Sequence, residues 1–173
     1  MGIALGLLIL RIVTGVILIG HGTQKLFGWW GGPGMTGWIG AMNRMRIRPA
    51  APWAWISMLA EVLGGLGLIV GLLTPFPSLA IAGSMLVAIA LVHWPRGFWV
   101  SKGGYEFNLS ILAAIAAIAI AGPGAYSLDS ALGLHLPEPT TLIIGTVLLL
   151  IGVGFALRTR APEPAADSKV QAA

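Results

Sequence analysis

Long apolar runs separated by short polar or glycine- and proline-rich breaks make up most of this chain. Five of the runs have the length and hydrophobicity typical of membrane-crossing helices. Their predicted bounds are residues 3–27, 53–73, 78–94, 106–121 and 140–157. The third and fourth are shorter than the roughly 20 residues that cross a hydrocarbon core. We therefore expect these two spans to begin or end in backbone that is shielded from lipid.

The predicted fold is an all-α integral membrane protein with two kinds of membrane-spanning helix. Residues 1–132 are expected to form a four-helix transmembrane bundle, and residues 133–158 to add a fifth, peripheral C-terminal span. That span has no ionisable residue before Arg158 and only a modest small-residue face, so we expect it at the bundle edge, with no part in ligand binding. Residues 159–173 are rich in Ala, Pro and charge, which predicts a disordered cytoplasmic tail.

Composition supports this class. Hydrophobic residues make up 57% of the chain and charged residues only 9%, against roughly a quarter in soluble domains. The net charge of +4 rests on few charges, so it reflects orientation in the membrane and excludes nucleic-acid binding. The chain has no cysteine, which excludes disulfides, thiolate metal sites, iron–sulfur clusters and a thiol relay of its own.

The basic residues predict the orientation. Five spans place segments 28–52 and 95–105 on the same side as the C-terminus. This side carries Arg44, Arg46, Arg48, Arg96, Lys102, Arg158, Arg160 and Lys169. The other side has no Lys or Arg but holds Asp129 and Glu138. By the positive-inside rule the basic side is cytoplasmic and the N-terminus is outside. All seven tryptophans also lie on the basic side, more than an interfacial belt needs, so we expect some to line a pocket.

Polar side chains from four predicted spans reach a similar depth on the basic side. His21 and Lys25 share a helix face, and His93 and Glu106 lie at helix ends. Glu61 lies eight residues into its span, at a depth of ~12 Å. A buried carboxylate must pair with a cation or take up a proton, and the shallowest cation is Lys25. Two interpretations remain: polar groups that satisfy helix ends and lock the bundle, or a functional polar cluster.

Two further patterns concern packing and the membrane surface. Gly67 and Gly71, with Ala60 and Gly64, form a ridge of small residues in the second span, for which the first span is the expected partner. The run of residues 44–48, Arg-Met-Arg-Ile-Arg, is typical of a lipid-headgroup or orientation signal, with a docking surface for a soluble protein as the alternative.

Several ordered motifs carry a family resemblance. Arg11 is followed by His-Gly-x-Gln-Lys-Leu-Phe-Gly-Trp from His21, by Glu-x-x-Gly-Gly from Glu61, and by a His at the end of the third span. Gly-Gly-Tyr-Glu then opens the fourth span, and Gly-Pro-Gly-x-Tyr-Ser-Leu-Asp follows it. Over residues 7–132 the chain resembles the DoxX family of small polytopic membrane proteins. The matching positions are Arg11, His21, Gln24, Lys25, Phe27, Glu61, His93, Gly103 to Glu106, and Tyr126 to Asp129.

The resemblance implies a four-helix bundle in a bacterial or archaeal inner membrane. Some members of the family are subunits linked to thiosulfate:quinone oxidoreductase activity, others belong to membrane-associated oxidoreductase complexes, including ones linked to oxidative stress, and many have no assigned activity. A quinone is therefore the implied cofactor, with none covalently bound. The fifth span, the charged tail and the absence of cysteine depart from the family, and the last argues against sulfur chemistry on this chain's own side chains.

The predicted site is a single pocket on the cytoplasmic side. Its expected members are His21, Gln24, Lys25, Glu61, His93 and Glu106, with Trp29, Trp30 and Tyr105 above them. In this hypothesis His21 or His93 hydrogen-bonds a quinone carbonyl. Glu61 relays protons, while Lys25 keeps Glu61 ionised or stabilises the reduced quinol anion. No metal site is indicated, although two histidines on different helices are the arrangement of an axial haem pair.

The expected partners are membrane lipids and a soluble or membrane-bound oxidoreductase, with homo-oligomerisation left open. Two other functions remain: a protein that binds or transports a small molecule or lipid through the same pocket, and a membrane anchor for soluble enzymes.

A structural ion pair is predicted at the opposite, outer end. Arg11 lies sixteen residues, ~24 Å, from Phe27 along its helix, and the segment ending in Asp129 can fold back over the bundle. An Arg11–Asp129 pair would close that end, with snorkelling of Arg11 to lipid phosphate as the alternative.

Overall fold

The computed structural model of this chain describes residues 2–137 and 139–162. Met1, Glu138 and residues 163–173, which include Lys169 and most of the expected tail, lie outside the described residues. The main helices are α1 (Gly2–Phe27), α2 (Gly34–Arg44), α3 (Ala50–Val70), α4 (Pro75–Ala88), α5 (Glu106–Ala121), α6 (Leu128–Ala131) and α7 (Thr140–Arg158). Short 3₁₀ turns lie at η1 (Trp29–Gly31), η3 (Trp94–Arg96) and η4 (Val100–Lys102), and a π-helical segment η2 (Ile89–His93) extends α4.

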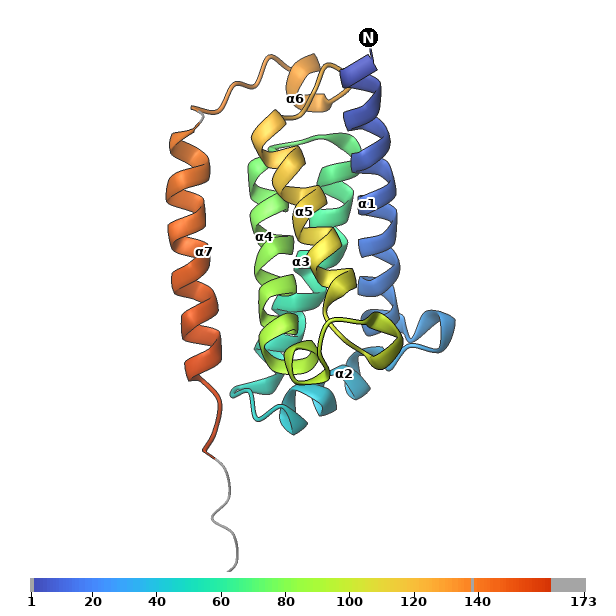
Figure 1. Cartoon of the computed structure of the whole chain (residues 1–173), viewed down its shortest axis with the longest axis vertical. Coiled ribbons are helices and arrows are strands. Elements are labelled where there is room, and N and C mark those ends of the chain that lie inside the picture. The colour runs from blue at the N-terminus through green and yellow to red at the C-terminus, as the bar shows by residue number, and fades with distance from the viewer. Residues whose placement is uncertain (1, 138, 163–173) are drawn as a thin grey trace, which may run out of the picture.

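Helices α1, α3, α4 and α5 pack side by side as a four-helix bundle, and α7 lies outside the bundle and packs along α4 (Figure 1). The all-α membrane fold is therefore confirmed. Among the described residues, four helices are long and apolar enough to cross a membrane: α1, α3, α4 with its extension to Arg96, and α7. Helix α5 has only 16 residues, as the sequence predicted. Backbone hydrogen bonds also form within the loop that precedes it.

Helix α2 was not predicted. It lies across the end of the bundle where α1 ends (Figure 1). Its apolar positions recur with helical spacing and pack against the start of α3, in a cluster of Met35, Trp38, Ile39, Met42, Ile47, Ala50 and Ala54. The signal was present as an amphipathic period, but the glycines and arginines around it favoured a loop.

The core between the four bundle helices is apolar. Its buried side chains are Leu18, Leu68, Ile81, Met85, Ile111, Ile115 and Ile118. Many large hydrophobic side chains point outward instead, among them Ile9, Val16 and Leu63, each more than half exposed. A helix bundle that is apolar both in its core and on its outer surface is suited to lipid surroundings.

Glycines set the distance between α1 and α3. A Cβ atom on Gly65 would lie 2.7 Å from the carbonyl oxygen of Gly15, and one on Gly15 would lie 2.6 Å from that of Gly65. The first span is thus the partner of α3, as expected, but Gly65 makes the contact. The predicted ridge divides between two neighbours, since Gly64 and Gly67 lie against α4 at Ile81 and Pro77, whereas Gly71 lies against Arg11 of α1.

We expect Gly65→Ala to lower the free energy of unfolding by about 1–3 kcal/mol, because the added methyl group meets backbone and forces the helices apart. The measurement is unfolding by SDS titration in mixed micelles, followed by circular dichroism. Gly154→Ala in α7 is the matched control, since nothing lies within 4 Å of its Cβ position. Equal stability of the two variants would contradict the close-contact argument.

At the end of the bundle opposite α2, the structure corrects the prediction of an Arg11–Asp129 ion pair. Arg11 is 1% exposed, and its guanidinium donates to the carbonyl oxygens of Pro123 and Tyr126. Asp129 accepts from the backbone N–H groups of Leu73 (2.7 Å) and Thr74 (3.0 Å). The two side chains form no direct ion pair in the described chain. Backbone groups of the turns bind each of them instead, although the Arg11 Nε atom is buried without a hydrogen-bond partner. Snorkelling to lipid is equally excluded by the burial of Arg11.

Candidate ligand-binding site

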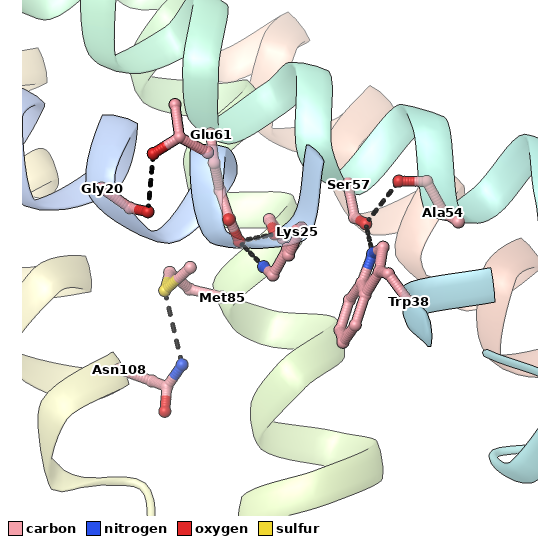
Figure 2. Close-up of polar contacts among 10 residues, drawn as sticks. Gly20, Lys25, Trp38, Ala54, Ser57, Glu61, Met85 and Asn108 are labelled. Carbon is pink, nitrogen blue, oxygen red and sulfur yellow. Dashed lines mark hydrogen bonds and ion pairs between the residues drawn. The ribbon is translucent and has the colours of Figure 1, made fainter. Parts of the chain in front are cut away.

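An ion pair joins the last turn of α1 to the middle of α3. Lys25 donates to the Oε1 oxygen of Glu61, which also accepts from the hydroxyl of Ser84 on α4 at 3.0 Å (Figure 2). The Glu61 side chain is 2% exposed and that of Lys25 16%. The pair expected from the depth of Glu61 is present, and it sits where a lone charge would be strongly disfavoured.

The second carboxylate oxygen of Glu61 is left without a donor. Oε2 is buried and has no hydrogen-bond partner among the described residues. Nearby in the bundle, the Asn108 amide nitrogen donates to the sulfur of Met85 at 3.4 Å, and its oxygen also lacks a donor (Figure 2).

An aromatic ring covers the other side of Lys25. The ammonium nitrogen lies 4.6 Å from the centroid of the Trp38 ring, in a cation–π contact. The Trp38 indole N–H donates to the hydroxyl of Ser57 at 2.9 Å, and this hydroxyl donates to the carbonyl of Ala54 at 3.0 Å (Figure 2). Lys25 is thus fixed between a carboxylate and a ring.

Sequence reasoning did not assign Ser57, Ser84 or Trp38 to the site. Ser57 lies one helical turn before Glu61 and therefore shares its face, which was a usable signal. Ser84 and Trp38 needed the packing of α4 and α2, which the sequence did not show.

Lys25 lies at the edge of a cavity of about 300 Å³ that is partly open to the outside. This volume is at the lower end of the range of small-molecule sites. Lys25, Trp38, Ser57 and Ser84 supply the polar lining. The rest is apolar and comes from α2 and the loop after it, from α3, α4, η2 and α7: Met42, Met45, Ile47, Trp53, Ile56, Ala60, Ala80, Gly83, Val87, Ala88, Val92, Leu149, Gly152, Val153 and Ala156.

The contribution of α7 corrects one expectation. The span is peripheral, as predicted, but Leu149, Gly152, Val153 and Ala156 form one wall of the cavity. Gly152 and Ala156 are one turn apart, and their small side chains leave room beside α4, with nothing within 4 Å of the Gly152 Cβ position. The small size of Gly152 and Ala156 therefore leaves room for the cavity beside α4.

The cavity includes only part of the predicted pocket, because several of the predicted members do not line it. His21 is exposed and packs against the ring of Phe107 on α5, with centroids 5.3 Å apart, and it stays within electrostatic range of Glu61 and Lys25. Gln24 lies beside the turn at Gly32. Trp29 and Trp30 are 52% and 70% exposed and stand on the surface. None of these four residues lines the cavity.

A second group of predicted site residues stabilises the loop before α5 instead. The Nδ1 atom of His93 lies 2.7 Å from the carbonyl oxygen of Gly103. Tyr105 stacks on Trp94 with ring centroids 5.3 Å apart, and the backbone N–H of Glu106 donates to the carbonyl of Phe98. The structure thus separates His93, Tyr105 and Glu106 from Lys25. Within the described residues, no group of three or more His, Cys, Asp or Glu is placed to hold a metal ion.

Comparisons with known proteins agree with the motifs. The DoxX family model matches residues 6–94, from α1 to the end of the π-helical segment. The inner membrane protein YqjF of Escherichia coli (strain K12) is 31% identical over 125 residues, which cover 72% of this chain and 89% of the relative. No solved structure matches. The matched region includes Lys25, Trp38, Ser57, Glu61 and Ser84 and ends before α7.

Proposed function

This chain belongs to the DoxX family of membrane proteins, and we propose that it is the membrane subunit of a quinone-linked oxidoreductase system, in which it binds a quinone from the bilayer. One observation carries the proposal: a buried Lys25–Glu61 pair lies at the polar end of an otherwise apolar cavity. We place the protein in a bacterial or archaeal inner membrane, with support from the name of the Escherichia coli relative.

The cavity matches the two chemical parts of a quinone. The flat head carries carbonyl oxygens, which accept hydrogen bonds, and Lys25 is a charged donor at the cavity edge. Ser57 and Ser84 add hydroxyl groups beside it. The apolar walls of α3, α4 and α7 suit an isoprenoid tail that enters from lipid.

Lys25 and Glu61 have different roles in this proposal. Lys25 touches the ligand, and its charge is maintained by the carboxylate behind it. Glu61 does not line the cavity, so it acts through Lys25, and its Oε2 atom accepts no hydrogen bond from the described residues. A quinone held by Lys25 would supply the redox chemistry, since its reduction to the quinol requires two electrons and two protons. The electrons would come from an oxidoreductase partner, and Glu61 would hand protons on through Lys25.

We expect Lys25→Met to lower quinone affinity by roughly 10- to 100-fold, the usual loss for a hydrogen bond to a charged group. The assay is organic extraction of the purified protein with absorbance and mass spectrometry of the extract, followed by titration with added quinone. Lys102→Met, in an exposed loop turn, removes a charge away from the cavity and is the matched control.

A second variant tests the cavity without disturbing the ion pair. Gly152→Leu on α7 fills open space in the cavity and is expected to reduce quinone occupancy while Lys25 and Glu61 stay paired. Normal quinone binding by both variants would overturn the proposal. A phospholipid or another apolar molecule in the extract, with no quinone, would instead favour the second function, binding or transport of lipid-like molecules, to which the apolar walls are also suited.

A further inference from the structure

Two distant segments of the chain are joined at the end of the bundle that holds the cavity. Residues 46–48, after α2, pair with residues 159–161, after α7, in a short antiparallel bridge between Ile47 and Arg160. The backbone N–H of Arg48 donates to the carbonyl of Thr159 at 3.2 Å, and that of Ala161 to Arg46 at 2.8 Å. We call residues 44–48 and 158–161 the arginine clasp. Residues 159–161 are thus bound to the bundle, in contrast to the expected disordered tail.

The arginine clasp gathers exposed positive charge. Arg44, Arg48, Arg158 and Arg160 are all exposed. Two of them are held in place, since Arg48 donates to the Asn43 side chain and the Nε of Arg160 donates to the carbonyl of Met45 at 3.2 Å. No acidic residue in the described ranges forms an ion pair with any of these four. The segments that bring them together lie 115 residues apart in sequence.

The arginine clasp lies at the membrane boundary. Helix α7 is an apolar span of 19 residues that ends at Arg158, and the span α3 begins at Ala50, just after Arg48. Both helix ends therefore place the arginines at the level of lipid phosphates. Met45 and Ile47, which alternate with the arginines, turn inward and line the cavity. Exposed Phe155 and Ile151 continue the apolar surface along α7.

We propose that the arginine clasp binds the phosphate group of an anionic phospholipid. Guanidinium groups bind phosphate oxygens in a bidentate manner, and basic clusters beside membrane spans select anionic lipids. The apolar surface of α7 directly adjoining the charges favours a lipid over a soluble anion, because the acyl chains have a surface to lie on. None of the four arginines lines the cavity proposed to bind quinone, so this proposal stands independently of that one.

The test compares binding of phosphatidylglycerol and phosphatidylcholine with identical chains to the full-length protein, by native mass spectrometry from detergent. The wild type is expected to prefer phosphatidylglycerol by at least tenfold. Arg48→Gln/Arg160→Gln should weaken phosphatidylglycerol binding about 30-fold, at the usual contribution of each basic residue near a lipid surface. Arg96→Gln/Lys102→Gln removes the same charge from another exposed loop and is expected to change binding less than about threefold.

Because Arg48 and Arg160 also make bonds within the arginine clasp, Arg44→Gln/Arg158→Gln provides a second variant whose side chains have no such bonds in the described structure. It should lose phosphatidylglycerol preference as well. Equal loss in the Arg96/Lys102 control would overturn the proposal in favour of a general charge effect. Displacement of the lipid by glycerol phosphate at equal concentration would overturn it in favour of a free-anion site, and an absence of lipid preference would overturn it outright.

Discussion

Glu61→Ala is expected to lower the free energy of unfolding by about 3–5 kcal/mol, since it leaves the ammonium group of Lys25 in a mostly buried position without its carboxylate. It also removes the acceptor of the Ser84 hydroxyl. The measurement is SDS unfolding followed by circular dichroism. Glu106→Ala is the matched control, because the Glu106 side chain is only half-buried and makes no bond in the described structure, so its loss should cost less than about 1 kcal/mol.

Glu61→Gln separates the fold from the proposed function. The amide oxygen can still accept from Lys25 and Ser84, so we expect a loss of only about 1–2 kcal/mol and retained quinone occupancy. Quinone-dependent turnover with the oxidoreductase partner should nevertheless fall, because an amide holds no proton for transfer. If the Gln variant turns over normally, Glu61 has no role in proton transfer. If the Ala variant is as stable as the control, Lys25 must reach water, and the buried pair is not a stabilising element.

Depth along a helix was readable from the sequence, but direction around the helix was not. The apolar runs predicted the bounds of five long helices to within a few residues, and the cost of burying a lone carboxylate predicted that Glu61 would meet Lys25. His21 shares a helix face with Lys25 by spacing, yet it packs on α5 while Lys25 reaches α3. Which neighbour each side chain meets depends on helix packing, and residue spacing alone does not reveal that packing.

Departures from ideal α-helical geometry also explain why some predicted site residues do not line the cavity. The π-helical segment Ile89–His93 has more residues per turn than an α-helix, so side chains after Ala88 are rotated from the positions that α-helical spacing would give. His93 is consequently directed toward the loop at Gly103. Likewise the ends of α2 and α7 are joined by the arginine clasp, a long-range pairing for which the local sequence has no signal. The charges were visible in the sequence, but their convergence was not.

Asp129→Ala should destabilise the opposite end of the bundle by about 3–5 kcal/mol. It leaves three donors at the start of α4 without their acceptor, namely the N–H groups of Leu73 and Thr74 and the Thr74 hydroxyl. Thr74 is 1% exposed, and each unsatisfied buried donor costs about 1–3 kcal/mol. Asp129→Asn keeps one acceptor oxygen and is expected to be milder. The measurement is again SDS unfolding of the purified protein.

Arg11 anchors the same segment that contains Asp129, through its hydrogen bonds to the carbonyl oxygens of Pro123 and Tyr126. We therefore expect its replacement to lower the free energy of unfolding as well. Arg11→Met leaves the carbonyls of Pro123 and Tyr126 unpaired, whereas Arg11→Lys keeps the charge but cannot span both oxygens. We expect both variants to be less stable than the wild type. Wild-type stability of Arg11→Lys would show that charge alone matters. Because Arg11 and Asp129 anchor one segment, the double mutant Arg11→Met/Asp129→Ala should cost less than the sum of the single changes, even without a direct ion pair. Strictly additive losses would mean that the two anchors act on separate parts of the fold.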